Sequence, residues 1–216
     1  MLPIWTAANE AVISGRGVPL SAEVCMLGLH VSTRLNILPR VVQRVNTNTL
    51  NLLSKMVGHG PEYVFTEAQE GFAYPVDHDL KYSLLADIDT LLFELNSACE
   101  LMSRLFSLLH THVGQSISPK KLGKAIADVL VQDNQDAGWF VSLDKHRNFF
   151  MHEGAPYLAI DISNEPETFD LLIMKENVRV FTDPKTFVAL SEINVIVQGF
   201  MAAKQRLQEH LVSLFK

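Results

Sequence analysis

The sequence predicts a mainly α fold, an up-and-down helical bundle with a small antiparallel β insert before the last helix. Apolar residues recur at steps of three and four over long stretches, which is the spacing of one buried face of an α-helix. This spacing is interrupted at about 155–182 by short β-rich runs between turn residues. No internal repeat is visible, so we expect a single domain over residues 1–216, with a helical core at about 21–153 and 183–215.

Residues 1–20 contain three residues that break helices: Gly15, Gly17 and Pro19. We therefore expect an irregular lead-in there. A helical pattern follows, and Pro39 should kink or split it, because proline cannot donate the backbone hydrogen bond of a helix. The expected result is two helices at roughly 21–37 and 39–58, before a loop-like stretch at 58–77.

The strongest helical pattern covers residues 78–113. Apolar residues hold the helical spacing through the whole stretch: Leu80, Leu84, Ile88, Leu91, Leu95, Ala98, Met102, Leu105, Leu109 and Val113. A helix of this length spans roughly 50 Å, at about 1.5 Å per residue. Such a rod needs apolar partners along its length, and a bundle of helices supplies them.

Two more helices are expected before the β insert. Ser118 and Pro119 form a typical helix start, with serine as the N-cap and proline in the first turn. The basic residues that follow, in "SPKKLGK", are interpreted as a solvated first turn, with an anion-binding rim as the alternative. Asn134 and Gly138 permit a break, and a further helix should cover about 136–153.

Three short runs, "PYLAIDIS", "FDLLIMK" and "VRVF", are rich in β-forming residues and separated by turn residues. They predict two or three strands within the insert at about 155–182. Asp183 and Pro184 are then expected to begin the last helix. Its apolar stripe should comprise Phe187, Leu190, Ile193, Val197, Met201, Leu207, Leu211 and Leu214.

Composition limits the classes of function. The net charge of −6 argues against a surface that coats nucleic acid, because such binding needs many exposed cations, although a local basic groove is still compatible with it. Cys25 and Cys99 lie in apolar runs and are predicted to be small buried residues in a reducing compartment. Neither a signal-peptide pattern nor an apolar run of about 18 residues is visible, so we expect a cytoplasmic protein that contacts no membrane.

The eight histidines do not form a metal-binding pattern. His110 and His112 are two residues apart, so on a helix they point in nearly opposite directions and cannot easily share one ion. The sequence also contains no glycine-rich phosphate loop and no nucleophile elbow. We therefore expect no metal and no cofactor.

The segment "LDKHRNFFMHEG", residues 143–154, carries unusual polar residues in an apolar helix. Arg147 falls within a predicted apolar stripe, where a guanidinium needs an anionic partner or a cleft. Asp144 is a local partner, and a buried Arg147–Asp144 pair is the purely structural interpretation. The predicted stripe comprises Trp139, Phe140, Leu143 and Phe150.

A ribbon of polar residues follows the neighbouring face of this helix. Asp144, Asn148 and His152 are spaced four residues apart, which aligns them on one face. Asn148 is placed to hold the His152 ring by a hydrogen bond. His152 would lie in the last helical turn, where a cation suits the helix dipole. Arg147 lies five residues before His152, so the two side chains can border one groove but are not expected to grip one atom.

The stretch "RNFFMH", residues 147–152, resembles the R-x4–6-H signature of the HEPN superfamily, the higher eukaryotes and prokaryotes nucleotide-binding domains. The position agrees with the resemblance, because the motif would end the penultimate helix and a last helix follows. The resemblance covers about 78–215, or 21–215 with the first helices. It implies a four-helix core and a dimer in which each motif faces its symmetry mate.

The resemblance also implies an activity. Many HEPN domains are metal-independent endoribonucleases of toxin–antitoxin and other defence systems. Carried over by position, Arg147 is the motif arginine, Asn148 the polar residue after it, and His152 the motif histidine. The implied partners are RNA, a second copy of the chain, and an antitoxin or nucleotidyltransferase protein.

Two alternatives stay open. A non-catalytic HEPN-like module that binds RNA, a nucleotide or a protein would agree equally well with the acidic chain. A plain helical structural protein would use Arg147 only as part of a core salt bridge.

Overall fold

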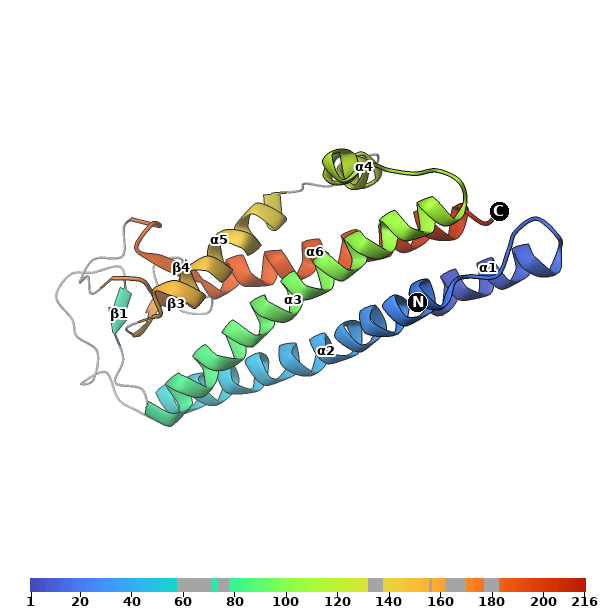
Figure 1. Cartoon of the computed structure of the whole chain (residues 1–216). Coiled ribbons are helices and arrows are strands. Elements are labelled where there is room, and N and C mark those ends of the chain that lie inside the picture. Colours follow the sequence, from blue (N-terminus) through green and yellow to red (C-terminus); the bar gives the residue numbers. More distant parts are fainter. Residues whose placement is uncertain (58–70, 74–77, 132–137, 156, 162–169, 177–182) are drawn as a thin grey trace. The chain divides into compact units, whose positions relative to one another are not determined.

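The computed structural model describes residues 1–57, 71–73, 78–131, 138–155, 157–161, 170–176 and 183–216. These residues form a mainly helical fold with a small antiparallel sheet, as predicted (Figure 1). The described helices are α1 (Leu2–Ile13), α2 (Ala22–Val57), α3 (His78–His112), α4 (Pro119–Val131), α5 (Gly138–His152) and α6 (Leu190–Ser213).

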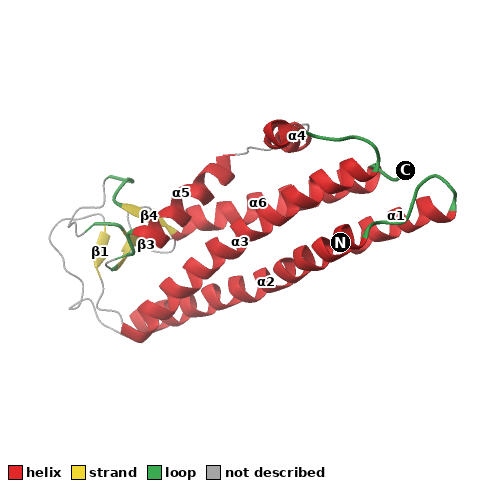
Figure 2. Ribbon diagram, viewed as in Figure 1, coloured by secondary structure: helices red, strands yellow, loops and turns green. Residues whose placement is uncertain are grey.

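Within the described residues, the sheet has four strands in the order β1-β2-β3-β4, and every neighbouring pair is antiparallel. Figure 2 shows the yellow strands gathered where α6 begins. The predicted insert at about 155–182 holds two of them, β2 and β3, while β1 and β4 lie outside it. The strands are β1 (Gly71–Ala73), β2 (Leu158–Asp161), β3 (Asp170–Met174) and β4 (Phe187–Ala189). The predicted strand "VRVF" lies outside the described residues.

The start of α6 differs from the prediction. Asp183 does not cap a helix but closes a turn, in which its carboxylate accepts a hydrogen bond from the Lys185 backbone N–H at 2.9 Å. Phe187–Ala189 can therefore pair with β3 as the edge strand β4. The first turn of α6 is instead capped by Asp170 of β3, whose carboxylate accepts hydrogen bonds from the Ser191 backbone N–H and hydroxyl.

The chain divides into two compact units, and the division passes through α2, α3, α5 and α6. One unit comprises Met1–Leu38, Glu94–Val141 and Val197–Lys216, and the other comprises Pro39–Phe93 and Ser142–Ile196. The second unit contains the sheet together with most of α5.

The irregular lead-in predicted for residues 1–20 was wrong, because Leu2–Ile13 forms α1. Pro3 lies in the first turn, where its missing N–H costs nothing. Four residues at helical spacing are buried on one face: Ile4, Ala7, Ala8 and Ala11. The breakers act only after this helix, where Gly15 adopts a φ of 71°.

Pro39 does not split α2, which runs as one helix over 36 residues. The proline is exposed, so its ring meets solvent, although it removes one backbone hydrogen bond and crowds the carbonyl of the preceding turn. Buried residues continue on both sides of it without a change of spacing, at Val31, Leu38, Val41 and Val45. Tertiary packing of this face outweighs the cost of the proline.

The prediction for residues 78–113 was confirmed, because α3 covers His78–His112 and none of the residues of its predicted stripe is exposed. The stripe predicted for α6 differs at three positions. Phe187 lies in β4, Leu214 lies beyond the end of the helix, and Met201 is exposed while Phe200 is buried instead. The helix starts predicted at Pro119 and near residue 136 agree with α4 and α5.

Cys25 is exposed, which contradicts the prediction that it is buried, and Cys99 is half-buried. Both cysteines are free, and burial raises the pKa of Cys99 to about 12, which keeps it an unreactive thiol. Within the described parts of the chain, no helix is both long and apolar enough to cross a membrane.

Candidate functional site

The motif residues lie in the last turns of α5, in the unit that also holds the sheet. The helix ends as the sequence indicates, with His152 in its last turn and Gly154 beyond it at a φ of 73°. The backbone N–H groups of Glu153 and Gly154 both donate to the Phe149 carbonyl, at 2.9 and 3.3 Å. Gly154, with its left-handed backbone conformation, ends the helix here and so fixes the position of the His152 backbone in the last turn.

Arg147 is half-buried, and its Nε is buried without a hydrogen-bond partner. The Arg147–Asp144 pair of the structural interpretation is not formed, since the described residues contain no ion pair or hydrogen bond between these two side chains. Asp144 is exposed instead. A buried guanidinium nitrogen without an acceptor is costly, so the site favours an anion beside Arg147.

Asn148 and His152 are both exposed, in agreement with a polar ribbon on one face of α5. The amide of Asn148 lies 3.5 Å from the Asp144 carboxylate, one turn towards the N-terminus. The expected hydrogen bond from Asn148 to His152 is absent from the described structure. The His152 ring is therefore open to solvent and to any ligand at this end of the helix.

Sequence reasoning missed His146, which is the buried histidine of this helix, at 2% exposure. Its Nε2 lies 3.0 Å from a carboxylate oxygen of Glu192 in the first turn of α6, and its Nδ1 is buried without a partner. The signal was present in the spacing, because His146 lies three residues after Leu143 and three before Phe149, both of which are buried. Phe140, which was assigned to the stripe, is 49% exposed.

Two lysines contribute to the electrostatics around His146. Burial is the main cause that lowers the pKa of His146; the Glu192 carboxylate acts in the opposite direction, and the charges of Lys175 and Lys145 lower the pKa further. Burial and Lys145 also lower the pKa of Lys175, whose ammonium lies 5.4 Å from the centre of the Phe149 ring. His146 is therefore neutral at pH 7, with Nε2–H donating to Glu192.

We predict that acid destabilises the fold through His146. A histidine whose pKa is lowered by folding contributes no pH dependence well above its unfolded value of about 6.5, and stability is lost as the pH falls below that value. Urea unfolding between pH 7.5 and 5 should therefore show a smaller loss of stability for His146→Gln than for wild type. His152→Gln, a substitution at an exposed position, is the control. The prediction would be wrong if the free energy of unfolding of His146→Gln depended on pH as steeply as that of wild type.

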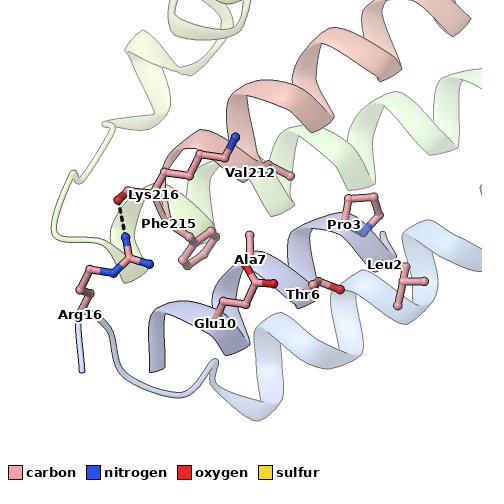
Figure 3. A pocket seen from close by; sticks show the side chains of 9 residues that line it. All are labelled: Leu2, Pro3, Thr6, Ala7, Glu10, Arg16, Val212, Phe215 and Lys216. Carbon is pink, nitrogen blue, oxygen red and sulfur yellow. Dashed lines mark hydrogen bonds between the residues drawn. The ribbon is translucent and has the colours of Figure 1, made fainter. Parts of the chain in front are cut away.

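A separate pocket of ≈ 370 Å³ lies in the other unit, between α1 and the end of α6 (Figure 3). Arg16 at its rim already donates to the backbone carbonyl of Lys216 and to the Ser14 hydroxyl. The described residues that line it include none of the motif residues. It therefore contributes nothing to the chemistry of α5.

The sequence matches no protein-family model, and comparison with curated proteins and with solved structures finds no match either. The described residues also contain no group of three or more side chains of the kinds that usually hold a metal ion. The candidate site is thus defined by its own side chains, which are a guanidinium in need of an anion, an exposed imidazole and an exposed amide.

Proposed function

We propose that this protein is a metal-independent endoribonuclease of the HEPN type, a toxin or defence component that acts in the cytoplasm. One observation carries the proposal. Arg147 is half-buried, its Nε has no acceptor, and Asp144 does not neutralise it, while the imidazole of His152 is exposed at the end of the same helix. An RNA phosphate is an anion that fits the guanidinium, and its neighbouring 2′-hydroxyl requires a base.

The residues divide the chemistry between them. His152 would accept the 2′-hydroxyl proton or protonate the leaving 5′-oxygen, and Arg147 would stabilise the charge on the phosphoryl group in the transition state. Asn148 would position the phosphate by hydrogen bonding. One histidine per chain cannot serve as both base and acid in one step, so the proposal requires a homodimer that brings two motifs into one cleft.

We predict that Arg147→Ala and His152→Ala each lower the rate of RNA cleavage in EDTA by at least about 100-fold. The melting temperature should stay nearly unchanged, because neither side chain forms an ion pair within the described residues. Cleavage of a labelled single-stranded RNA pool and thermal melting, measured on the same samples, test both statements.

Lys145→Ala is the matched control, since it removes an exposed cation from the same helix. It should cleave nearly as fast as wild type. Light scattering on these samples should give twice the chain mass. A persistent monomer, no EDTA-resistant cleavage by wild type, or an Arg147→Ala variant as active as wild type would each refute the proposal.

A non-catalytic HEPN-like module is the second candidate, and the charges at the end of α5 favour it. Asp144 and Glu153 are exposed carboxylates close in sequence to Asn148 and His152, and they would repel an RNA phosphate. An antitoxin or nucleotidyltransferase partner with a basic surface would fit them better. In this case the motif variants would abolish partner binding, and no RNA would be cleaved.

A further inference from the structure

Two histidines meet at the ends of α3 and α6, within one compact unit. The Nε2 atoms of His110 and His210 are 3.0 Å apart, although the two residues are separated by 100 positions in the chain. His110 is 7% exposed and His210 is half-buried. Two ring nitrogens that face each other form a hydrogen bond only when one carries a proton and the other presents a lone pair. The contact therefore depends on how many protons the pair holds.

The end of α3 fixes which of the two rings accepts the hydrogen bond. Gly114 takes a φ of 80°, and the Gln115 backbone N–H then donates to the His110 carbonyl at 2.8 Å. This turn brings the Gln115 side-chain oxygen to 3.1 Å from His110 Nδ1. An amide oxygen only accepts, so Nδ1 carries the proton of the neutral His110 ring, and its Nε2 presents a lone pair. His210 is then the donor, through its Nε2–H.

The surroundings of the pair offer no compensation for a positive charge. Phe106 packs against both imidazoles, with ring centroids 4.4 Å from His110 and 5.4 Å from His210. Within the described part of the chain, neither ring has a carboxylate as a hydrogen-bond partner. The charged side chain that acts on His210 is Arg206, one turn earlier on α6, whose guanidinium lies 3.6 Å from the Glu209 carboxylate.

The two protons that acid can add to the pair have different consequences. The first can bind to Nδ1 of His210, whose Nε2–H then still donates to His110. The second must bind to Nε2 of His110, because its Nδ1 already carries a proton, and this atom is the acceptor of the hydrogen bond. Two N–H groups on like-charged rings then face each other across 3.0 Å, which replaces an attraction with a repulsion.

We propose that the His110–His210 pair is an acid-sensitive latch, which holds the end of α6 on α3 at neutral pH and releases it when both rings are protonated. The release would also open the pocket between α1 and α6 (Figure 3). Three residues that follow His210 form one wall of that pocket, namely Val212, Phe215 and Lys216. This inference is independent of the α5 motif.

The titration of the two rings gives the direction of the effect. Burial lowers the pKa of both histidines; the charges of His110 and Arg206 lower the pKa of His210 further, while the Gln115 hydrogen bond raises that of His110. Released rings take up protons near their ordinary pKa of about 6.5. The released state therefore binds more protons below that pH, so acid favours release and a return to neutral pH restores the latch.

Nuclear magnetic resonance of the full chain, labelled with nitrogen-15, tests the proposal at pH 7.5 and pH 5. In wild type at pH 7.5, the His110 ring should be in the Nδ1–H form and the amides at 210–216 should be ordered. At pH 5 both rings should be protonated, and the order parameters at 210–216 should fall below about 0.6, the range of a flexible backbone. Amides in α2 should stay ordered at both pH values, because the release is local.

His210→Gln is the decisive variant, and its half-buried position tolerates the substitution. The glutamine amide can donate to neutral His110 and accept from protonated His110, so no pair of like charges forms, and 210–216 should stay ordered at pH 5.

His112→Gln, at the same end of α3, is the matched control. His112 Nε2 lies 3.2 Å from the Val18 carbonyl and can donate to it in both protonation states, so this variant should release the segment as wild type does. Three outcomes in wild type would each overturn the proposal: an ordered segment at pH 5, an Nε2–H form of His110 at pH 7.5, or loss of order throughout the chain. Equal release in wild type and His210→Gln would overturn it too.

Discussion

Arg34→Ala should lower the free energy of unfolding by roughly 3–5 kcal/mol. Arg34 on α2 donates to Glu94 on α3 at 2.6 Å, and the Glu94 side chain is only 9% exposed. The second carboxylate oxygen of Glu94 is buried without a partner. Removing the guanidinium leaves a buried carboxylate with neither solvent nor a cation, so chemical denaturation should show a large loss of stability.

Arg44→Ala is the matched control on the same two helices. Arg44 donates to Asp87 at 2.8 Å, but its side chain is 54% exposed, and Asp87 retains the amide of Asn48 at 2.9 Å. Arg44→Ala should therefore lower the free energy of unfolding by at most about 1 kcal/mol. Arg34→Met with Glu94→Leu should recover most of the stability, because it removes both charges together. Equal losses for Arg34→Ala and Arg44→Ala would contradict the burial of Glu94.

Gly199→Ala should destabilise the protein by roughly 1–3 kcal/mol, although alanine is the better helix former. A Cβ at this position of α6 would lie 2.4 Å from Cγ and 2.8 Å from Cβ of Trp139. The Trp139 Cβ is bonded to the backbone, so rotating the side chain cannot relieve the contact. The Trp139 ring is also held edge-on by Phe200. Calorimetry should show a lower melting temperature.

Gly123→Ala, inside α4, is the control for helix propensity. Nothing lies within 4 Å of a Cβ at this position, so the substitution should stabilise the protein by about 0.5–1 kcal/mol. The two substitutions should therefore change stability in opposite directions. A gain of stability from Gly199→Ala would show that α6 does not pack closely on Trp139.

The sequence alone determined the elements whose signal is local. The predicted range of α3 agrees with the structure because its apolar residues keep one helical face throughout, whatever packs against that face. Pro119 likewise marked the start of α4, since proline restricts only its own turn. Local rules failed where packing outweighed them: Pro39 lies inside α2 because the buried residues on either side of it keep one face.

Only the tertiary structure decided the start of α6 and the buried residues of α5. Asp183 and Pro184 suit a helix start, but pairing with β3 extends the strand to Ala189, and Asp170 then caps the helix. In α5, the spacing of apolar residues fitted a buried His146 and a buried Arg147 equally well, because a phenylalanine follows each of them by three residues. The presence of Glu192 opposite His146 decided it, because a buried imidazole needs a partner.

The polar pairs were beyond the sequence for a physical reason. Arg34 and Glu94 are 60 positions apart, and His110 and His210 are 100 apart. The strength of such a pair depends on the distance between its atoms and on the exclusion of water, and neither quantity is contained in sequence spacing. The sequence thus determined α3, α4, α5 and the polar composition of the α5 motif, while the packing of distant segments decided which charged and imidazole groups became buried partners.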